Sequence, residues 1–321
     1  PVVLLLFAFF FLVIVVFQML YPLKKGLFIE HYGANLELYA KLGNIVVAAL
    51  AVTFFTYLYD RLPRQRLIYV LCGFFIVSFV ALLHPLAATD PGPVPVWGFY
   101  MLGDLVTTLL VAGFWAYATD LSTSDQAKRL FGVIGGGGIM GGLVGISLTK
   151  VLLHKIGMQG LLVMSAAAMG LIILVTFLAE SLVRRIEAFR HAAESPMLGP
   201  SGGQEKSKLS AAVEGAQLVM RSRYLAAIVG IMAFYEMASQ VMDYQFSSFM
   251  EMLSGVTATQ AFVTDVRLYA NVLSVVVQFF LVSLIMKRLG LVVALLVLPV
   301  AILGSSGAFL VVPTLTAASL L

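Results

Sequence analysis

The chain has 321 residues, of which 61% are hydrophobic and 11% are charged, and its mean hydropathy is +1.01. Soluble globular domains are excluded, because about 25% of their residues are charged. The net charge of +4 gives no reason to expect a nucleic-acid partner, since lysine and arginine in so apolar a chain report membrane topology first. A helix needs about 20 apolar residues to cross a bilayer, and this chain has several such runs. The composition therefore predicts an all-α polytopic membrane protein.

Nine apolar runs give the expected membrane spans. They cover about residues 2–20, 38–59, 67–88, 97–119, 130–153, 159–181, 224–250, 265–286 and 290–312. The first run is too long for the apolar core of a signal peptide, and no basic segment precedes it. The links after the second, fourth, sixth and eighth runs hold 14 of the 20 lysine and arginine residues. The positive-inside rule therefore places these links and the N-terminus in the cytoplasm, and we expect a bacterial inner membrane.

A long polar link after the sixth run divides the chain. We expect residues 1–181 to form a six-helix N-terminal half, 182–223 a cytoplasmic linker, and 224–321 part of a C-terminal half with three spans. Within the linker, RRIEAFRH (184–191) has the pattern of an amphipathic surface helix. Because the second half lacks three helices and the chain does not start with methionine, we expect a fragment, or the ordered part, of a longer protein.

Two sixteen-residue segments resemble each other. QMLYPLKKGLFIEHYG (18–33) and QVMDYQFSSFMEMLSG (240–255) both begin with Gln and end with Gly, and LYAKLGNIVV (38–47) and LYANVLSVVV (268–277) follow them. This similarity predicts a parallel repeat of two six-helix halves, as in the major facilitator superfamily. The expected fold is therefore a major-facilitator-like helical bundle with an incomplete second half.

A glycine cluster lies near the start of the fifth run. The pairs Gly137/Gly141, Gly138/Gly142 and Gly141/Gly145 are four residues apart, so they share a helix face on which small residues let helices pack closely. A phosphate loop is a poor interpretation, because no Gly-Lys-Ser/Thr follows and no strand precedes. We expect a packing or gating role, with direct ligand contact as the alternative. The gating set also includes the charged link residues Asp60, Arg61, Lys128 and Arg129.

Ionisable residues within membrane spans are costly, so each is a candidate for function. Lys24 and Lys25 follow Pro22, at which we expect a kinked or broken helix. Two adjacent ammonium groups could hold a phosphate or another multivalent anion, whereas the alternative is that both snorkel to the interface. Asp104 lies well inside the fourth run and needs a lysine partner or a proton.

Two acids in the seventh run, Glu236 and Asp243, are seven residues apart and share a helix face. We expect one to pair with Lys24, Lys25 or Lys41 and one to titrate during transport, with a structural salt bridge as the alternative. Gln18 and Gln240 occupy matching positions in the two repeats. The expected substrate-binding set is Lys24, Lys25, Asp104, Glu236, Asp243, Gln18 and Gln240.

Three further cations near span ends are interpreted as interface residues. Lys41 and Lys150 are expected to snorkel, and Arg267 is expected to anchor its helix, with an anion contact as the alternative. No catalytic arrangement or metal-ligand spacing is visible, and Cys72 lies inside an apolar run. We therefore expect no enzyme activity, cofactor or metal.

One stretch resembles a known family. FWAYATDLSTSDQAKRLFGVIGGGGIMGGLVG (114–145) resembles the ATP/ADP translocases of plastids and obligate intracellular bacteria, and their bacterial relatives. YPLKKGLFIEHYGANLELYAKLGNIVV (21–47) resembles the end of that family's first helix, and VMDYQFSSFM (241–250) resembles its seventh-helix segment. The matching residues of the first stretch are Phe114, Trp115, Ala127, Lys128, Arg129, Phe131 and Gly135 to Gly138.

The resemblance implies a major-facilitator-like fold of twelve helices that exchanges nucleotides across the membrane. It places transport-critical charges at Lys24 or Lys25, Asp104 and Asp243. The chain departs from the family in having Asp at two acidic positions and Ser247 where a basic residue is expected.

The sequence thus predicts a secondary transporter that moves an anionic, phosphorylated metabolite by alternating access. Its expected partners are membrane lipid and a small anionic substrate such as a nucleotide. The alternative is a non-transporting membrane scaffold, or an accessory subunit of a larger membrane complex.

Overall fold

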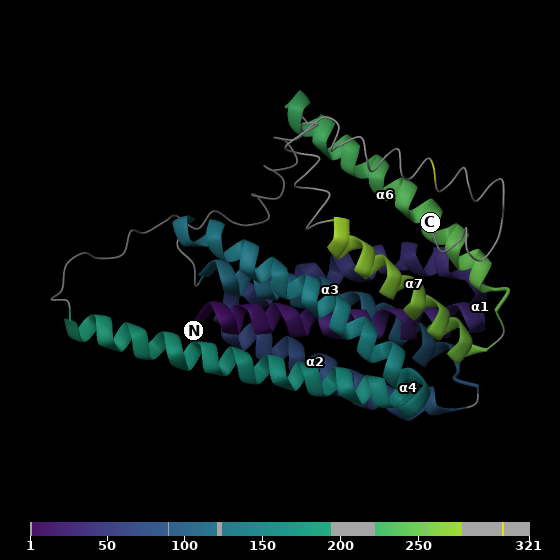
Figure 1. The fold of residues 1–321 in the computed structure, drawn as a ribbon, viewed down its shortest axis with the longest axis horizontal. Helices are drawn as coiled ribbons and strands as arrows, with labels where there is room; N and C mark the ends of the chain where they lie inside the picture. The colour runs from purple at the N-terminus through teal and green to yellow at the C-terminus, as the bar shows by residue number, and fades with distance from the viewer. Residues whose placement is uncertain are drawn as a thin grey trace.

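The computed structural model describes residues 2–88, 90–120, 124–193, 222–253, 255–277 and 304, and these contain helices and turns but no strand. The helices are α1 (Val2–Arg61), α2 (Arg64–Leu83), the 3-10 helix η1 (Pro85–Ala87), α3 (Pro93–Asp120), α4 (Ser124–Ala193), α6 (Arg223–Met250) and α7 (Val256–Val276) (Figure 1). Four helical stretches are long and apolar enough to cross a membrane: Val3–Arg61, Arg64–Ala87, Pro93–Thr119 and Ile134–Leu182. The prediction of an all-α membrane protein is confirmed for this part of the chain. The ninth expected span, 290–312, lies outside it except for Gly304.

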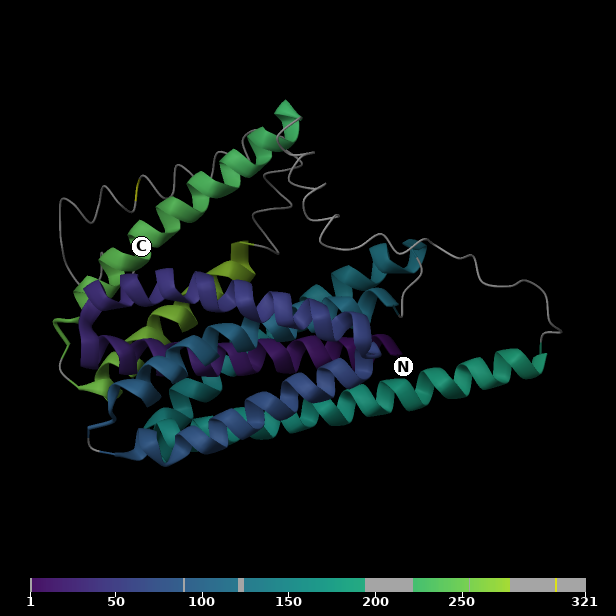
Figure 2. The same ribbon diagram turned by 180° about the vertical axis from the view of Figure 1, so that it is seen from behind.

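Helix α1 consists of two limbs that meet at Gly33. This glycine has φ 74° and ψ 173°, a left-handed conformation that side chains with a Cβ rarely adopt. Lys25 Nζ lies 3.6 Å from Glu37 Oε1, whereas twelve residues of straight helix would separate them by about 18 Å. The chain therefore reverses at Gly33, and the two limbs run antiparallel (Figures 1 and 2). Of the kink or break expected at Pro22, the break is wrong, because the helix continues through this proline.

The first limb of α1 also runs past residue 20, where the sequence predicted its end. The charged residues Lys24 and Lys25 suggested that end, but both are buried inside the bundle, with 4% and 1% of their surface exposed. A hydropathy pattern cannot distinguish a charge at the membrane surface from one that is paired within the protein. Snorkelling of these two lysines is excluded by their burial.

Helix α4 likewise has two limbs, which meet at Gly157 with φ 66° and ψ −175°. Its first limb begins at Ser124, so much of the expected polar link between the fourth and fifth runs is helical. Its second limb continues to Ala193 and includes RRIEAFRH, which is therefore continuous with a membrane helix. In both views the end of α4 projects beyond the other helices (Figures 1 and 2).

The glycine face of α4 packs against the first limb of α1. A Cβ added to Gly137, Gly141 or Gly145 would lie 2.8, 2.5 or 2.8 Å from the carbonyl oxygen of Phe7, Phe11 or Val15, respectively. The three carbonyl groups belong to residues four apart, as do the three glycines. The row of glycines therefore packs along one face of α1.

The other residues of the expected gating set lie elsewhere. Gly138 faces the Phe10 ring, and Gly142 faces the Asn271 side chain. Asp60 and Arg61 are exposed at the end of α1. The side chains of Lys128 and Arg129 lie outside the described residues.

Aromatic packing fixes α3 beside α1. Phe9 lies edge-on to Phe114, with ring centroids 5.1 Å apart. Phe28 contacts both Trp97 and Tyr100, with centroid distances of 5.1 and 4.6 Å. Since Tyr100 and Asp104 are one helical turn apart, this contact brings Asp104 next to the first limb of α1.

Helices α6 and α7 complete the described bundle. Helix α7 begins at Val256, after Gly255 with φ 99°, and not at residue 265 as the sequence predicted. Its first turns contain the buried polar residues Thr259, Gln260 and Thr264, which lowered the hydropathy of the segment. Towards its N-terminus α6 diverges from the bundle in both views, and its residue Phe234 is 77% exposed (Figures 1 and 2).

Candidate functional site

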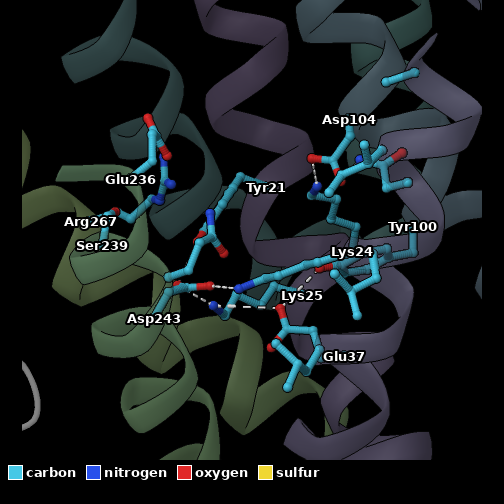
Figure 3. A pocket seen from close by; sticks show the side chains of 17 residues that line it. Tyr21, Lys24, Lys25, Glu37, Tyr100, Asp104, Glu236, Ser239, Asp243 and Arg267 are labelled. Carbon is cyan, nitrogen blue, oxygen red and sulfur yellow. Dashed lines mark hydrogen bonds and ion pairs between the residues drawn. The ribbon is translucent and has the colours of Figure 1, made fainter. Parts of the chain in front are cut away.

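A cavity of about 770 Å³ lies between α1 and α3 on one side and α6 and α7 on the other (Figure 3). Its charged lining consists of four cations and four carboxylates, so their formal charges balance. These residues are Lys24, Lys25, Glu37, Lys41, Asp104, Glu236, Asp243 and Arg267. Six of the seven residues expected to bind substrate line this cavity, and Gln18 lies beside it.

The first ion pair joins Lys24 on α1 to Asp104 on α3. Lys24 Nζ bonds to Asp104 Oδ1, and Asn44 Nδ2 donates to Asp104 Oδ2 at 3.0 Å. Lys24 Nζ also lies 4.8 Å from the centre of the Tyr100 ring, a favourable cation–π distance. The lysine partner that the position of Asp104 called for is therefore Lys24.

The second group is centred on Asp243 of α6. Lys25 Nζ lies 2.5 Å from Asp243 Oδ1, and Lys41 Nζ bonds to Asp243 Oδ2. Lys25 belongs to the first limb of α1 and Lys41 to the second. One carboxylate thus holds both limbs of α1 to α6.

One member of this site, Glu37, was not recognised in the sequence. For Lys41 the sequence favoured snorkelling, which is wrong, over the alternative of an ion pair with Glu236 or Asp243; Lys41 binds Asp243 in the cavity. Glu37 is buried and accepts a hydrogen bond from the Tyr100 hydroxyl at 3.1 Å. It follows Gly33 by four residues, so only the chain reversal at Gly33 brings it back to Lys25. By contrast Lys150, which pairs with Asp265 at 3.0 Å, is 44% exposed and lies outside this cavity.

Arg267 lines the cavity from α7 and is held by a closed hydrogen-bond network. Its Nη1 donates to Gln18 Oε1 at 3.0 Å, Gln18 Nε2 donates to Asn271 Oδ1 at 3.1 Å, and Asn271 Nδ2 donates to the Arg267 carbonyl at 2.9 Å. The guanidinium carbon lies 3.2 Å from the centre of the Tyr21 ring. Interface anchoring, which the sequence favoured for Arg267, is therefore wrong. Glu236 and Gln240 line the cavity with exposed side chains.

Two turns meet at one end of the bundle (Figure 2). The Glu251 carboxylate accepts from the backbone N–H of Ala34, and the Glu30 carboxylate accepts from the backbone N–H of Gly255 at 2.8 Å. The Tyr244 hydroxyl donates to Asn35 Oδ1 at 2.7 Å. We call these three hydrogen bonds the latch.

A bundle of apolar helices around a cavity lined by partly buried ion pairs defines an integral membrane protein with a polar internal site, an arrangement typical of substrate pathways. The TLC ATP/ADP transporter family matches residues 96–319, and the chain belongs to this family. The chain is also 23% identical to ADP,ATP carrier protein 1 of Rickettsia conorii (strain ATCC VR-613 / Malish 7) over 153 aligned residues. This alignment covers 39% of the chain and 31% of the relative, so the match spans about a third of that carrier. Within the described ranges, no three His, Cys, Asp or Glu side chains converge as metal ligands.

Proposed function

We propose that this protein is a secondary transporter that exchanges nucleotides such as ATP and ADP through the cavity, in a bundle of the major facilitator type. The observation that supports the proposal is the set of four cations, Lys24, Lys25, Lys41 and Arg267, that line one cavity in a chain of an ATP/ADP transporter family. Buried cations are the natural partners of a polyphosphate. The lysine and arginine residues in the links after alternate spans place the N-terminus in the cytoplasm by the positive-inside rule. We propose a bacterial inner membrane as the setting of this exchange.

The ion pairs give a mechanism for exchange. Asp104, Asp243 and Glu37 together balance the charges of the three lysines, which avoids the large cost of unpaired buried charges. A phosphate that enters competes with these carboxylates for the lysines. Once phosphate replaces Asp243, the tie between α1 and α6 is released, and the two sides of the cavity can rock. The empty protein stays tied, so exchange is favoured over net transport.

The cavity also has a neutral polar group for the rest of a nucleotide. Asn44 lines it, and the Oδ1 atom of this side chain is buried without a hydrogen-bond partner in the described part of the chain. An unpaired buried acceptor is unfavourable by about 1–3 kcal/mol. A ribose hydroxyl or a base amino group would satisfy it.

Exchange of labelled ATP for internal ADP in proteoliposomes with the purified full-length protein tests this function. Lys24→Gln is expected to reduce exchange at least tenfold, because it removes a phosphate partner and leaves Asp104 without a lysine. The matched control is Lys150→Gln, which removes the same charge from an exposed pair outside the cavity, and it should exchange at the wild-type rate. Absence of nucleotide exchange in folded wild-type protein would refute the proposal.

A further inference from the structure

Arg267 differs from the three lysines of the cavity. Each lysine lies within ion-pair distance of a carboxylate: Lys24 of Asp104, and both Lys25 and Lys41 of Asp243. Arg267 has no ion-pair partner among the described residues. A guanidinium has five N–H donors, and the bond to Gln18 is the one side-chain hydrogen bond that Arg267 makes with this part of the chain.

The surroundings of Arg267 hold it in place without neutralising it. The Tyr21 ring stacks against one face of the guanidinium, and the Gln18–Asn271 network fixes its edge. Neither contact supplies a negative charge. A planar, fixed guanidinium matches the geometry of a phosphate and can bind two of its oxygens at once.

We propose that Arg267 is the residue that first binds the substrate's phosphate, before the lysines exchange their carboxylates for it. This inference rests on the proposed function, in that the substrate is a phosphorylated anion. Docking on Arg267 requires no ion pair to break. It brings the phosphate charge into the cavity that contains Asp243, where that charge then competes for Lys25 and Lys41.

Two measurements test the role of Arg267. In ATP exchange, Arg267→Gln is expected to raise the half-saturating concentration about tenfold or more, the size of one charge-assisted hydrogen bond. Arg267→Lys keeps the charge but not the planar fork, and should recover only part of the loss. Binding of inorganic tripolyphosphate to the purified protein, which does not depend on transport, should weaken by a similar factor in Arg267→Gln.

The outcomes separate this inference from the proposed function. Wild-type exchange with unchanged half-saturation and unchanged tripolyphosphate binding in folded Arg267→Gln would overturn the role of Arg267 and leave the function standing. No wild-type exchange, together with weaker tripolyphosphate binding by the variant, would overturn the function but keep the phosphate contact. The melting temperatures of both variants establish that they are folded.

A second inference rests on the latch. Each of its two turns contains a glycine in the left-handed region, Gly33 and Gly255, and these glycines end the two sixteen-residue segments that resemble each other. Each segment also supplies, three or four residues before its glycine, the glutamate that bonds to the other turn. The contact is therefore reciprocal. A Cβ at Gly33 would lie 2.6 Å from Glu251 Oε1, so glycine is needed for the approach as well as for the turn.

Apolar residues that neighbour the latch glutamates also pack together. Ile29, Met250 and Val263 form a small buried cluster at this end of the bundle. A Cβ at Gly26 would lie 2.5 Å from the Gln260 side chain, so α1 and α7 are also in close contact there. At the opposite end α6 diverges from α1 (Figure 2).

The geometry assigns the latch as the closed gate on the side of the two turns. For the cavity to open on that side, both carboxylate-to-backbone bonds must break. Because hydrogen bonds to a charged group are among the stronger ones, the latch favours the state that is open at the other end.

Accessibility of a cavity cysteine tests the gate without a transport assay. Cys72 is replaced by Ala, and Ser239→Cys supplies a reporter in the cavity lining. A membrane-impermeant maleimide is then added to vesicles from the side of the turns. Glu251→Ala and Glu30→Ala are each expected to increase the labelling rate about tenfold, as loss of one charged hydrogen bond predicts, whereas Asp265→Ala, an exposed acid outside the latch, should not. Unchanged labelling in the Glu30→Ala/Glu251→Ala double variant would overturn the gate.

Discussion

Asp243→Asn is expected to abolish nucleotide exchange and to destabilise the protein strongly. The substitution removes the carboxylate that forms ion pairs with both Lys25 and Lys41. Lys25 is 1% exposed, so it is poorly hydrated, and Glu37 at 3.6 Å is the remaining acid near it. Loss of one partner from a buried ion pair typically costs about 3–5 kcal/mol. Exchange is lost because α1 and α6 no longer have the carboxylate that phosphate displaces.

A double variant distinguishes loss of function from simple unfolding. In Asp243→Asn/Lys25→Gln the buried charge and its missing partner are removed together, so the loss of stability should be smaller than the sum of the two single losses. The double variant is expected to fold but not to exchange nucleotides. Thermal unfolding in detergent and ATP exchange in proteoliposomes measure the two effects.

The matched control for this pair lies on the surface. Asp265→Asn breaks the ion pair with Lys150, whose two side chains are 44% and 45% exposed. Exposed pairs contribute about 0–1 kcal/mol, so this variant should keep both its stability and its exchange. Equal effects of Asp243→Asn and Asp265→Asn would contradict the central role of Asp243.

The sequence predicted much of the candidate site because of one physical cost. Charged groups in membrane spans are expensive, so Asp104, Asp243 and the two adjacent lysines stood out without any structure. The pairing could not be read in the same way. Whether Asp104 meets Lys24 or Lys25 depends on the direction of each side chain around the helix, which packing decides.

Glu37 shows why part of the site was missed, and Lys41 shows why its ion pair was not the favoured interpretation. They come shortly after a turn that depends on a single glycine with positive φ, and a glycine in an apolar sequence does not reveal its φ angle. Without the reversal at Gly33, both residues would be placed far from Lys25. The start of α7 was misplaced for a different reason. Its polar residues suggested a link between spans, but they are buried in the bundle.

The glycine face was predicted from spacing, and the structure identifies its neighbours. Spacing of four residues showed that Gly137, Gly141 and Gly145 share one face, but not which helix lies against it. The face meets carbonyl oxygens of α1, the helix that carries Lys24 and Lys25. Packing of α4 therefore fixes the helix that supplies most of the cavity cations.

Gly141→Ala is expected to prevent correct packing of α4 on α1, and it is the second large effect. The new Cβ would lie 2.5 Å from the Phe11 carbonyl oxygen and 3.2 Å from its Cα, and backbone atoms cannot move aside as a flexible side chain can. Overpacking of this kind costs roughly 1–3 kcal/mol, or more where the backbone must shift. Lower yield of folded protein, a lower melting temperature and weaker exchange should occur together.

Gly135→Ala is the matched control, since a Cβ at Gly135 meets no atom within 4 Å. This variant should be neutral or stabilising by about 0.5–1 kcal/mol, because alanine favours a helix. A Gly141→Ala protein as stable as Gly135→Ala would show that α4 and α1 are not packed this closely.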